Sequence, residues 1–600
     1  MFRQIFYLSF VILGVVLNLH ISGQASFAET DTIDEDYSSH DGEDARDWLS
    51  FGHGYSNHRY SPLKTINRSN VRYLVPRWIF QSGRTEAFQA QSLISDGKMF
   101  ITLPGNDLVC LDAETGEEFW RYKHRPRFDT RKTQGSNRGA SLAHGRVYHA
   151  TNDGRLIALS MNTGKVLWDR IISKPHPDEL IGLQIETVEI IEKNAENLAA
   201  KMPPLIVGNK VIVGVTTAGY GIFWQLGRGE IAHPAPPEYF RGMRGYVLAL
   251  DAGSGEEIWR WHTTPNTKWE GMYSTTTPDG FELPSEVLTE SLPYAFHKDG
   301  SKRGGSSTWM PPAYDPDLGL LFLGTGNASP NDVPSMRPGD NLYASSLVAL
   351  DITTGKIRWH YQQVPHDIWG YDVASTVILF NIERKGRIVS CVGVAGKTGW
   401  FYGHDRLTGQ LLFKSPPLVP QKNMFVSPTE EGISFSPGSF GGASWSPVSF
   451  DPRSGWVYVP AIHKPSLLIK RTATYFDGQK VNYVVTDVDP SEDSWGTLSA
   501  VNTRSNGKLA WKIRTKEPLI GGVLSTAGDL LFVGEGDGYF KALDSKTGDV
   551  LWSYQCGAGV NGPPVSYEIS GTQFVAVPAG GHALLGYKAG EALISFALPE

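Results

Sequence analysis

The feature that most constrains the fold is a short phrase that recurs along the chain. Its clearest copy, FKALDSKTGDVLW, occupies residues 540–552. Alternating residues lead into Asp544, a turn follows, and alternation resumes toward Trp552, which predicts a β-hairpin. The glycine of the turn supplies the positive φ that a short hairpin loop needs. Related phrases occur at 108–120, 156–168, 247–259, 347–359, 402–413 and 498–511.

An eighth segment, VRYLVPRWIF at 71–80, has the strand and its tryptophan but lacks the turn. Self-similarity at a spacing of about 40 to 100 residues indicates a repeat architecture. A strand-rich unit that closes on a tryptophan and repeats about eight times favours a β-propeller, where radial repetition protects the sheet edges. The sequence therefore predicts an all-β, eight-bladed β-propeller with tryptophan-docking repeats. The alternative is a set of unrelated hairpins.

The N-terminus has the pattern of an export signal. Arg3 precedes an apolar run at 5–17, and SFA at 26–28 resembles a cleavage site. This predicts a cleaved signal peptide at 1–28, rather than an uncleaved anchor, and a periplasmic or secreted protein. A flexible acidic lead-in (29–47) and the propeller (48–600) follow. No later stretch is apolar enough to span a membrane.

Composition excludes some functions. The net charge is −7 and no basic patch stands out, so nucleic-acid binding is not indicated. Cys110, Cys391 and Cys556 are too scattered for a disulfide framework, so free thiols are expected, with one bridge as the alternative. None lies in C-x-x-C-H, so no covalent haem is encoded.

Two stretches interrupt the repeat rhythm. Residues 171–201 place apolar side chains on one helical face and predict an inserted helix packed on the propeller. Residues 222–243 are rich in proline and glycine and predict a cap loop, of the kind that often shapes a binding site.

Longer motifs make the sequence more specific. The run GGSSTWMPPAYDPDLGLLFLGTGNASP begins at residue 304, and HDIWGYD ends at residue 372. Together with RYSPLKTIN, NRGASLAHGRVYHATNDGRLIAL and FGGASWSPVSFDPRSGWVYVPA, they resemble the quinoprotein alcohol dehydrogenases of the methanol and ethanol dehydrogenase type. The resemblance covers nearly all of the chain after the signal, apart from the two insertions.

The resemblance implies a definite chemistry. Family members are eight-bladed propellers that hold pyrroloquinoline quinone (PQQ) on the axis, above an aromatic floor. A metal ion, usually calcium, polarises the quinone. A carboxylate base takes the alcohol proton as hydride leaves, and the electrons pass to a cytochrome c.

Several family residues have counterparts here. Trp309 matches the stacking tryptophan, Arg138 matches an arginine that contacts the cofactor, and Lys397 matches the cation beside the quinone oxygens. Asn327 in GTGN matches a metal ligand. The alternatives are an inter-blade packing tryptophan, a turn arginine, a solvated loop lysine and a turn asparagine.

Other family positions have changed. Gly219 stands where the family has a metal-binding glutamate, and Gly370 where it has the catalytic aspartate. A vicinal cysteine pair, a glutamate, a threonine and an asparagine of the family align with Lys132-Thr133, Gln89, Lys201 and Ser444 respectively.

These changes make the site more cationic. We expect Lys132, Lys201, Arg138 and Lys397 to hold an anionic ligand such as PQQ, with Ser444 beside it. A calcium or lanthanide ion has lost two of its family ligands. Asp372 is the first candidate for the base, with Lys397 as electrophile; Asp367 and His366 come next.

Two functions compete. The first is an exported PQQ-dependent dehydrogenase that oxidises an alcohol-type substrate and passes electrons to a soluble cytochrome c. The second is a propeller that has lost redox catalysis and serves as a ligand-binding or protein-interaction scaffold, because fold does not fix function. Gly219 and Gly370 favour the second.

Overall fold

The structure is a computed structural model that describes residues 46–128, 137–175, 198–216, 244–265, 272–284, 305–474 and 480–599. The predicted signal peptide, nearly all of the lead-in, the cap loop and most of the predicted inserted helix lie outside these ranges. Across the described part the chain is all-β, and the helical turns are the short segments η1 (Val71–Tyr73), η2 (Pro104–Asn106), η6 (Pro334–Met336), η7 (Thr503–Ser505) and η8 (Ala583–Leu585).

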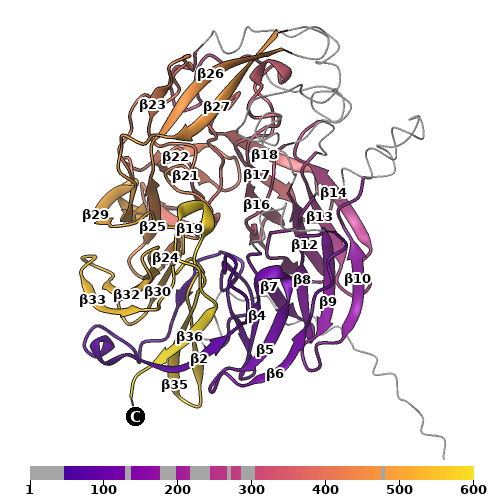
Figure 1. Cartoon of the computed structure of the whole chain (residues 1–600), viewed down its shortest axis with the longest axis vertical. Coiled ribbons are helices and arrows are strands. Elements are labelled where there is room, and N and C mark those ends of the chain that lie inside the picture. The colour runs from indigo at the N-terminus through magenta and orange to yellow at the C-terminus, as the bar shows by residue number, and fades with distance from the viewer. Residues whose placement is uncertain are drawn as a thin grey trace, which may run out of the picture.

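The strands form a ring of antiparallel sheets, in chain order (Figure 1). The first two sheets hold β3 (Leu93–Ser95), β4 (Lys98–Thr102), β5 (Leu108–Asp112) and β6 (Glu118–Tyr122), then β7 (Ala140–Ala143), β8 (Arg146–Ala150), β9 (Arg155–Ser160) and β10 (Val166–Ile171). The third and fourth hold β11 (Leu205–Val207), β12 (Lys210–Val215), β13 (Tyr246–Asp251) and β14 (Glu257–His262), then β15 (Ala313–Asp315), β16 (Leu320–Gly324), β17 (Ser346–Asp351) and β18 (Ile357–Gln362).

The second half continues the pattern. The fifth sheet holds β19 (Ile378–Arg384), β20 (Arg387–Ala395), β21 (Phe401–Asp405) and β22 (Leu411–Lys414), and the sixth holds β24 (Ser449–Asp451), β25 (Trp456–His463), β28 (Trp495–Asn502) and β29 (Lys508–Thr515). The seventh holds β30 (Val523–Thr526), β31 (Leu530–Gly534), β32 (Tyr539–Asp544) and β33 (Val550–Gln555), with β1 (Tyr60–Ser61) parallel to β30. The last holds β34 (Val565–Ile569), β35 (Thr572–Ala579) and β36 (Ala592–Ala597).

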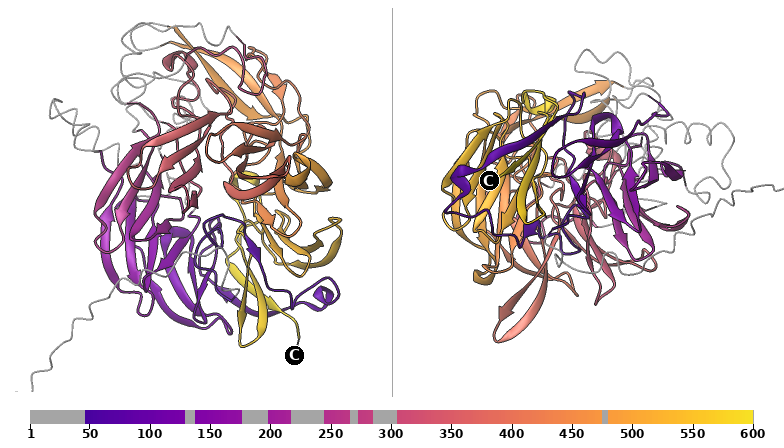
Figure 2. Two further views of the ribbon diagram at one scale, coloured as in Figure 1. Left: turned by 180° about the vertical axis from the view of Figure 1, so that it is seen from behind. Right: turned by 90° about the horizontal axis from the view of Figure 1, so that it is seen from below.

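Both ends of the chain meet in this last sheet. β2 (Val75–Gln81), near the N-terminus, pairs antiparallel with β36, so that Trp78 lies opposite Ser595. Figure 2 shows the indigo and yellow ends of the chain side by side in this part of the ring. The ring is therefore closed by backbone hydrogen bonds between the two ends.

An additional three-stranded sheet lies outside this ring of four- and five-stranded sheets. It contains β23 (Ile433–Phe435), β26 (Ser466–Thr474) and β27 (Lys480–Val488). Its side chains Phe435, Leu468 and Val484 pack against Trp369 and Tyr371. This accessory sheet therefore covers the loop that precedes β19.

Burial explains which strands lie inside a sheet. β5 and β13 are buried on both faces, whereas β29 alternates between exposed and half-buried side chains, as expected for a strand with one solvated face.

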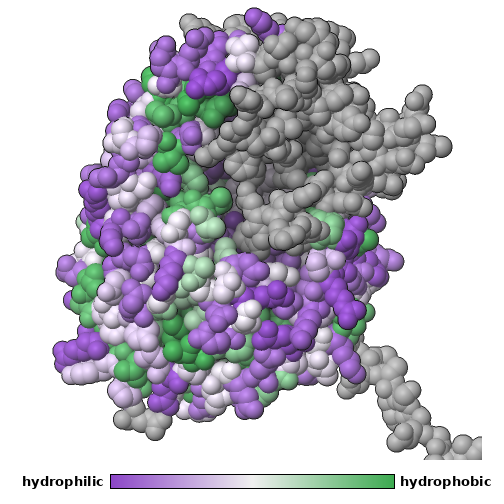
Figure 3. Space-filling model, in the orientation of Figure 1, coloured by the Kyte–Doolittle hydropathy of each residue, from purple (hydrophilic) through white to green (hydrophobic). Residues whose placement is uncertain are grey.

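On the face shown in Figure 3, the described surface is mostly hydrophilic and the apolar residues form separate small patches. Among the described residues, no helix has the length and apolar character to cross a membrane.

The recurring phrase builds the contact between neighbouring sheets. In its turn, Asp351 Oδ1 accepts hydrogen bonds from the backbone of Thr353 (3.1 Å) and Thr354 (2.9 Å), and Gly355 takes φ +67°. The indole of Trp259, from the preceding phrase, covers Gly355, and its Nε1 donates to Ile352 O at 2.9 Å. The predicted tryptophan docking is thus present, with analogous contacts from Trp78, Trp120, Trp168, Trp359, Phe413 and Trp511.

We expect Gly355→Ala to destabilise the protein by about 3 kcal/mol, because the new methyl group meets the Trp259 ring and the positive φ is strained. The measurement is the urea midpoint of unfolding. Gly386→Ala is the matched control, since Gly386 has φ +73° and nothing within 4 Å of the new methyl group, so it should lose only about 1 kcal/mol. Equal losses in the two variants would contradict the docking contact.

Candidate active site

The loop between β18 and β19 is folded around one carboxylate. Asp367 Oδ1 accepts hydrogen bonds from the backbone of Trp369 (3.0 Å) and Gly370 (3.1 Å), and Oδ2 accepts one from Tyr371 (2.8 Å). The Asn327 side-chain amide also donates to Oδ2. Because three backbone donors and one side-chain amide hold its two oxygens, Asp367 orders the loop and is less suited to be a base than a carboxylate with fewer donors.

The same loop presents Asp372 to two other segments. Its Oδ2 lies 2.6 Å from Lys397 Nζ, and its Oδ1 accepts the backbone N–H of Asn327 at 2.6 Å. The Asp372 side chain is 1% exposed and that of Lys397 is 13% exposed. Three residues singled out from the sequence, which follow β16, precede β19 and follow β20, therefore meet at one point.

Burial is the main cause of the shifted pKa values of the acids and the histidine in this loop. Burial raises the pKa of the Asp372 carboxyl, and the ammonium of Lys397 opposes that rise. Burial, together with the nearby Asp372 charge, raises the pKa of Asp367 to about 6. Burial and Arg337 lower the pKa of His366 to about 3, and its Nδ1 bonds to Gly339 O (2.8 Å), so His366 is held neutral in a structural role.

Trp309 lies next to this carboxylate. A methyl group placed on Gly326 would lie 2.8 Å from the Trp309 ring and 3.0 Å from Asp372 Oδ1, so the ring and the carboxylate flank the same glycine. Trp309 is 9% exposed and packs with Phe51, with Trp445 against the same cluster. The tryptophan predicted as a floor is therefore adjacent to the predicted acid.

A second group of predicted residues surrounds Trp445. The Arg138 guanidinium lies 5.8 Å from the centre of the Trp445 ring, and the His582 ring stacks on it at 5.6 Å. Burial, with a smaller effect of Arg138, lowers the pKa of Lys201 to about 7 and that of His582 to about 4. Arg138 and Lys201 are thus close enough to repel each other.

Gln89 and Ser444, which the resemblance singles out, and Trp445 carry buried polar atoms. Within the described ranges, Gln89 Oε1, Ser444 Oγ and Trp445 Nε1 are buried without a hydrogen-bond partner. Such atoms cost free energy unless a ligand or water satisfies them. Lys132 and Gly219 lie outside the described residues.

Gly370 adopts a conformation that disfavours a side chain. Its φ is +88°, and a methyl group there would lie 3.5 Å from Ser439 Cβ. The position is open but strained for other residues.

Sequence reasoning missed His582 and Phe51, which lie in no recognised motif; the glycines of GGH at 580–582 are the only local signal.

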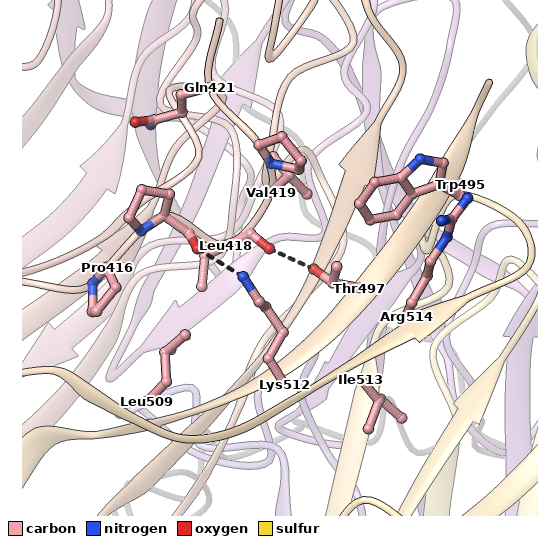
Figure 4. A pocket seen from close by; sticks show the side chains of 12 residues that line it. Pro416, Leu418, Val419, Gln421, Trp495, Thr497, Leu509, Lys512, Ile513 and Arg514 are labelled. Atoms are coloured by element: carbon pink, nitrogen blue, oxygen red, sulfur yellow. Dashed lines mark hydrogen bonds between the residues drawn. The ribbon is translucent and has the colours of Figure 1, made fainter. Parts of the chain in front are cut away.

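A separate pocket of about 660 Å³ lies between the segment 416–421 and strands β28 and β29 (Figure 4). Trp495, Lys512 and Arg514 line it, and Lys512 Nζ bonds to Pro417 O at 3.3 Å. None of the residues predicted for the active site lines this pocket. Its wall touches the turn after Lys397, because Gln421 Nε2 donates to Thr398 O at 3.0 Å.

Comparisons with known proteins cover most of the chain. The family model for the glucose, ethanol and alcohol dehydrogenase β-propeller domain, named PQQ, matches residues 48–423 and 482–575. The quinoprotein alcohol dehydrogenase PedH of Pseudomonas putida is 31% identical over 553 residues, which are 88% of this chain and 85% of that protein. The quinoprotein ethanol dehydrogenase of Pseudomonas aeruginosa is 30% identical over 90% of this chain and 87% of its own length.

Solved structures of dehydrogenases have a similar fold. The quinohemoprotein alcohol dehydrogenase ADHIIG of Pseudomonas putida HK5 superposes with a TM-score of 0.74 at 28% identity, covering 92% of this chain and 80% of that one. A europium-containing methanol dehydrogenase gives a TM-score of 0.74 at 26% identity, covering 93% of this chain and 99% of that one.

Proposed function

The chain belongs to the PQQ-dependent quinoprotein alcohol dehydrogenase family, and from this premise we propose that it is an active PQQ-dependent dehydrogenase of an alcohol-type substrate. The observation that carries the proposal is the arrangement around Gly326. There a buried aromatic ring, Trp309, lies next to a buried carboxylate, Asp372, which is paired with Lys397.

The residues present fit PQQ, a flat tricarboxylate. Trp309 offers an aromatic face, and the cations Arg138, Lys201 and Lys397 suit its carboxylates and quinone oxygens. Ser444 Oγ and Trp445 Nε1 supply buried polar atoms that a ligand would satisfy. Lys132, which is predicted from the sequence alone, is the remaining residue proposed to bind the cofactor.

The roles of the chain's own groups follow from their positions. Bound PQQ supplies the hydride acceptor. Asp372 takes the hydroxyl proton of the substrate at Oδ1, the oxygen that shares Gly326 with Trp309. Lys397 holds the Asp372 carboxylate in place and presents positive charge to the quinone oxygens. Asn327 fixes the other side of Asp372 through its backbone N–H.

Several wider features belong to the same proposal. The eight sheets of four or five strands within the described ranges serve as eight blades. The signal-like segment at 1–28 directs export to the periplasm or beyond. With no haem-attachment motif in the chain, a separate molecule such as a soluble cytochrome c takes the electrons.

One observation favours the alternative, a binding or interaction scaffold without catalysis. By the resemblance, Gly370 falls where the family has its catalytic aspartate, and its φ of +88° is a conformation that suits glycine. A scaffold would retain the cations Arg138, Lys201 and Lys397 for an anionic ligand but would lack a base.

The test is titration of the purified chain with PQQ, followed by dye-linked oxidation of primary alcohols. We expect saturable binding at about 1 μM or tighter and turnover above the protein-free rate. Binding without turnover across an alcohol panel would favour the scaffold. No saturation by about 100 μM PQQ would contradict both the cofactor and the enzyme.

Lys201 should give PQQ binding a pH dependence. Its pKa is lowered to about 7, so its ammonium is present below pH 7 and is lost above it. Because the protonated form attracts the PQQ carboxylates, affinity should be highest below pH 7 and fall by up to about tenfold per pH unit above it. Fluorescence titrations from pH 6 to 9 measure this. Lys201→Met should flatten the profile, and an unchanged slope in that variant would assign the titration to another group.

A further inference from the structure

The chain has glycine at two of the positions that surround the metal ion in the family. The resemblance places a metal-binding glutamate at Gly219, an asparagine ligand at Asn327 and the catalytic aspartate at Gly370, and some family members use an acid at the position of Asp372 as a ligand. Two of these positions are glycine, and calcium requires six to eight oxygen ligands. Within the described ranges, no group of three or more histidine, cysteine, aspartate or glutamate side chains is placed to hold a metal ion. The residues present therefore fit a metal poorly.

Both oxygens of the Asp372 carboxylate already have a partner within the protein. Asp372 Oδ2 pairs with Lys397 Nζ at 2.6 Å, and Oδ1 accepts the Asn327 backbone N–H at 2.6 Å. The Asn327 side-chain amide donates its N–H to Asp367, and only the oxygen of that amide has the chemistry of a metal ligand. A divalent ion bound to Asp372 would also lie close to an ammonium of the same sign, and the two would repel each other.

Lys397 is held in place by the backbone around it. Its N–H donates to Asp372 O at 3.1 Å, and its carbonyl accepts the N–H of Gly442 at 2.8 Å. Its aliphatic stem packs so closely on Gly441 that any side chain there would overlap it. Gly441 has φ +84°, a conformation suited to glycine. The ammonium is thus positioned before any ligand binds.

We infer that this protein binds its quinone without a metal ion, because the Lys397 ammonium held by Asp372 supplies the positive charge at that place. The inference rests on the proposed PQQ function and deepens it. It sets this chain apart from the europium-containing methanol dehydrogenase to which its fold is similar. A lysine ammonium is a compact point charge with three donors, which suits it to quinone and carboxylate oxygens.

The test compares PQQ binding in three buffers, containing EDTA, calcium chloride or lanthanum chloride. We expect PQQ dissociation constants within about threefold of each other, and less than about 0.1 metal ion per chain by mass spectrometry of the EDTA-treated, PQQ-loaded protein. Binding that requires calcium or lanthanum would overturn the inference alone. No binding in any buffer would remove the proposed PQQ function, and this inference with it.

Variants test the lysine itself. In EDTA, Lys397→Met should weaken PQQ binding by about 100-fold, and Lys397→Arg should retain most of it. Lys541→Met is the matched control, because Lys541 forms a similar buried ion pair with Glu535 at 2.5 Å; it should leave PQQ affinity unchanged. Wild-type affinity in folded Lys397→Met, judged by circular dichroism, would overturn the role of Lys397.

Discussion

Replacing Asp372 by asparagine is expected to lower kcat by about a thousandfold while PQQ remains bound. Asparagine keeps the size of the side chain and an oxygen to accept the Asn327 N–H, but it cannot take a proton. The loss should therefore appear in kcat, measured by dye-linked oxidation with ethanol as the test substrate. PQQ affinity, measured separately by fluorescence, reports whether Lys397 keeps its position when its partner Asp372 is replaced.

The control for this change is Asp279→Asn. Asp279 pairs with Lys414 at 2.7 Å and is also buried, so the variant breaks a comparable aspartate–lysine pair in another part of the chain. We expect its kcat to stay within about twofold of the wild type. If Asp372→Asn retained wild-type kcat with saturating PQQ, the base would have to be another group and the assignment would fail.

The largest effect on stability is expected at Arg59. This side chain is fully buried and donates to the carbonyls of Phe51 (2.5 Å), Val523 (3.2 Å) and Pro564 (2.7 Å), and to Gln91 Oε1. It thereby ties the N-terminal segment to the starts of β30 and β34. Burial lowers the pKa of Arg59 to about 9, because its guanidinium has lost contact with water.

Arg59→Ala should destabilise the protein by about 3 to 5 kcal/mol, because it leaves buried carbonyls without donors and opens a cavity. The urea midpoint of unfolding measures the loss. Arg59→Lys should recover less than half of it, since an ammonium lacks the planar five-donor fork. Arg453→Ala, which removes a partly exposed ion pair with Asp451, should lose about 1 kcal/mol or less. A loss that small at Arg59 would show that the buried bonds contribute little.

Local pattern predicted much of the fold. The phrase around Asp351 and Gly355 encodes its own turn, because the aspartate bonds to the next backbone N–H groups and the glycine accepts the docking tryptophan. Trp309, Asn327 and Asp372 could be predicted because each lies in a motif of a known family, and Lys397 because it matches a cation of that family. Their mutual contacts follow from the ring, which brings the ends of successive sheets together.

Long-range contacts could not be predicted in this way. Arg59 and Pro564 are 505 residues apart, and no periodicity links them. His582 stacks on Trp445 although neither neighbourhood signals an aromatic pair. The role of Asp367 could not be predicted either, because nothing in the sequence HDIWGYD distinguishes Asp367 from Asp372. Only the backbone donors around Asp367 distinguish the acid that shapes the loop from the acid beside Trp309.

The accessory sheet of β23, β26 and β27 has a consequence for how such an enzyme diverges. Most of it lies in the interval 424–481, between the two stretches that the family model matches. Its apolar side chains nevertheless press on Trp369 and Tyr371, whose loop carries Asp372. Substitutions in the accessory sheet can therefore shift the proposed base, Asp372, without changing the proposed reacting groups themselves. Two homologues with the same reacting groups can differ in rate or selectivity because different side chains pack behind this loop.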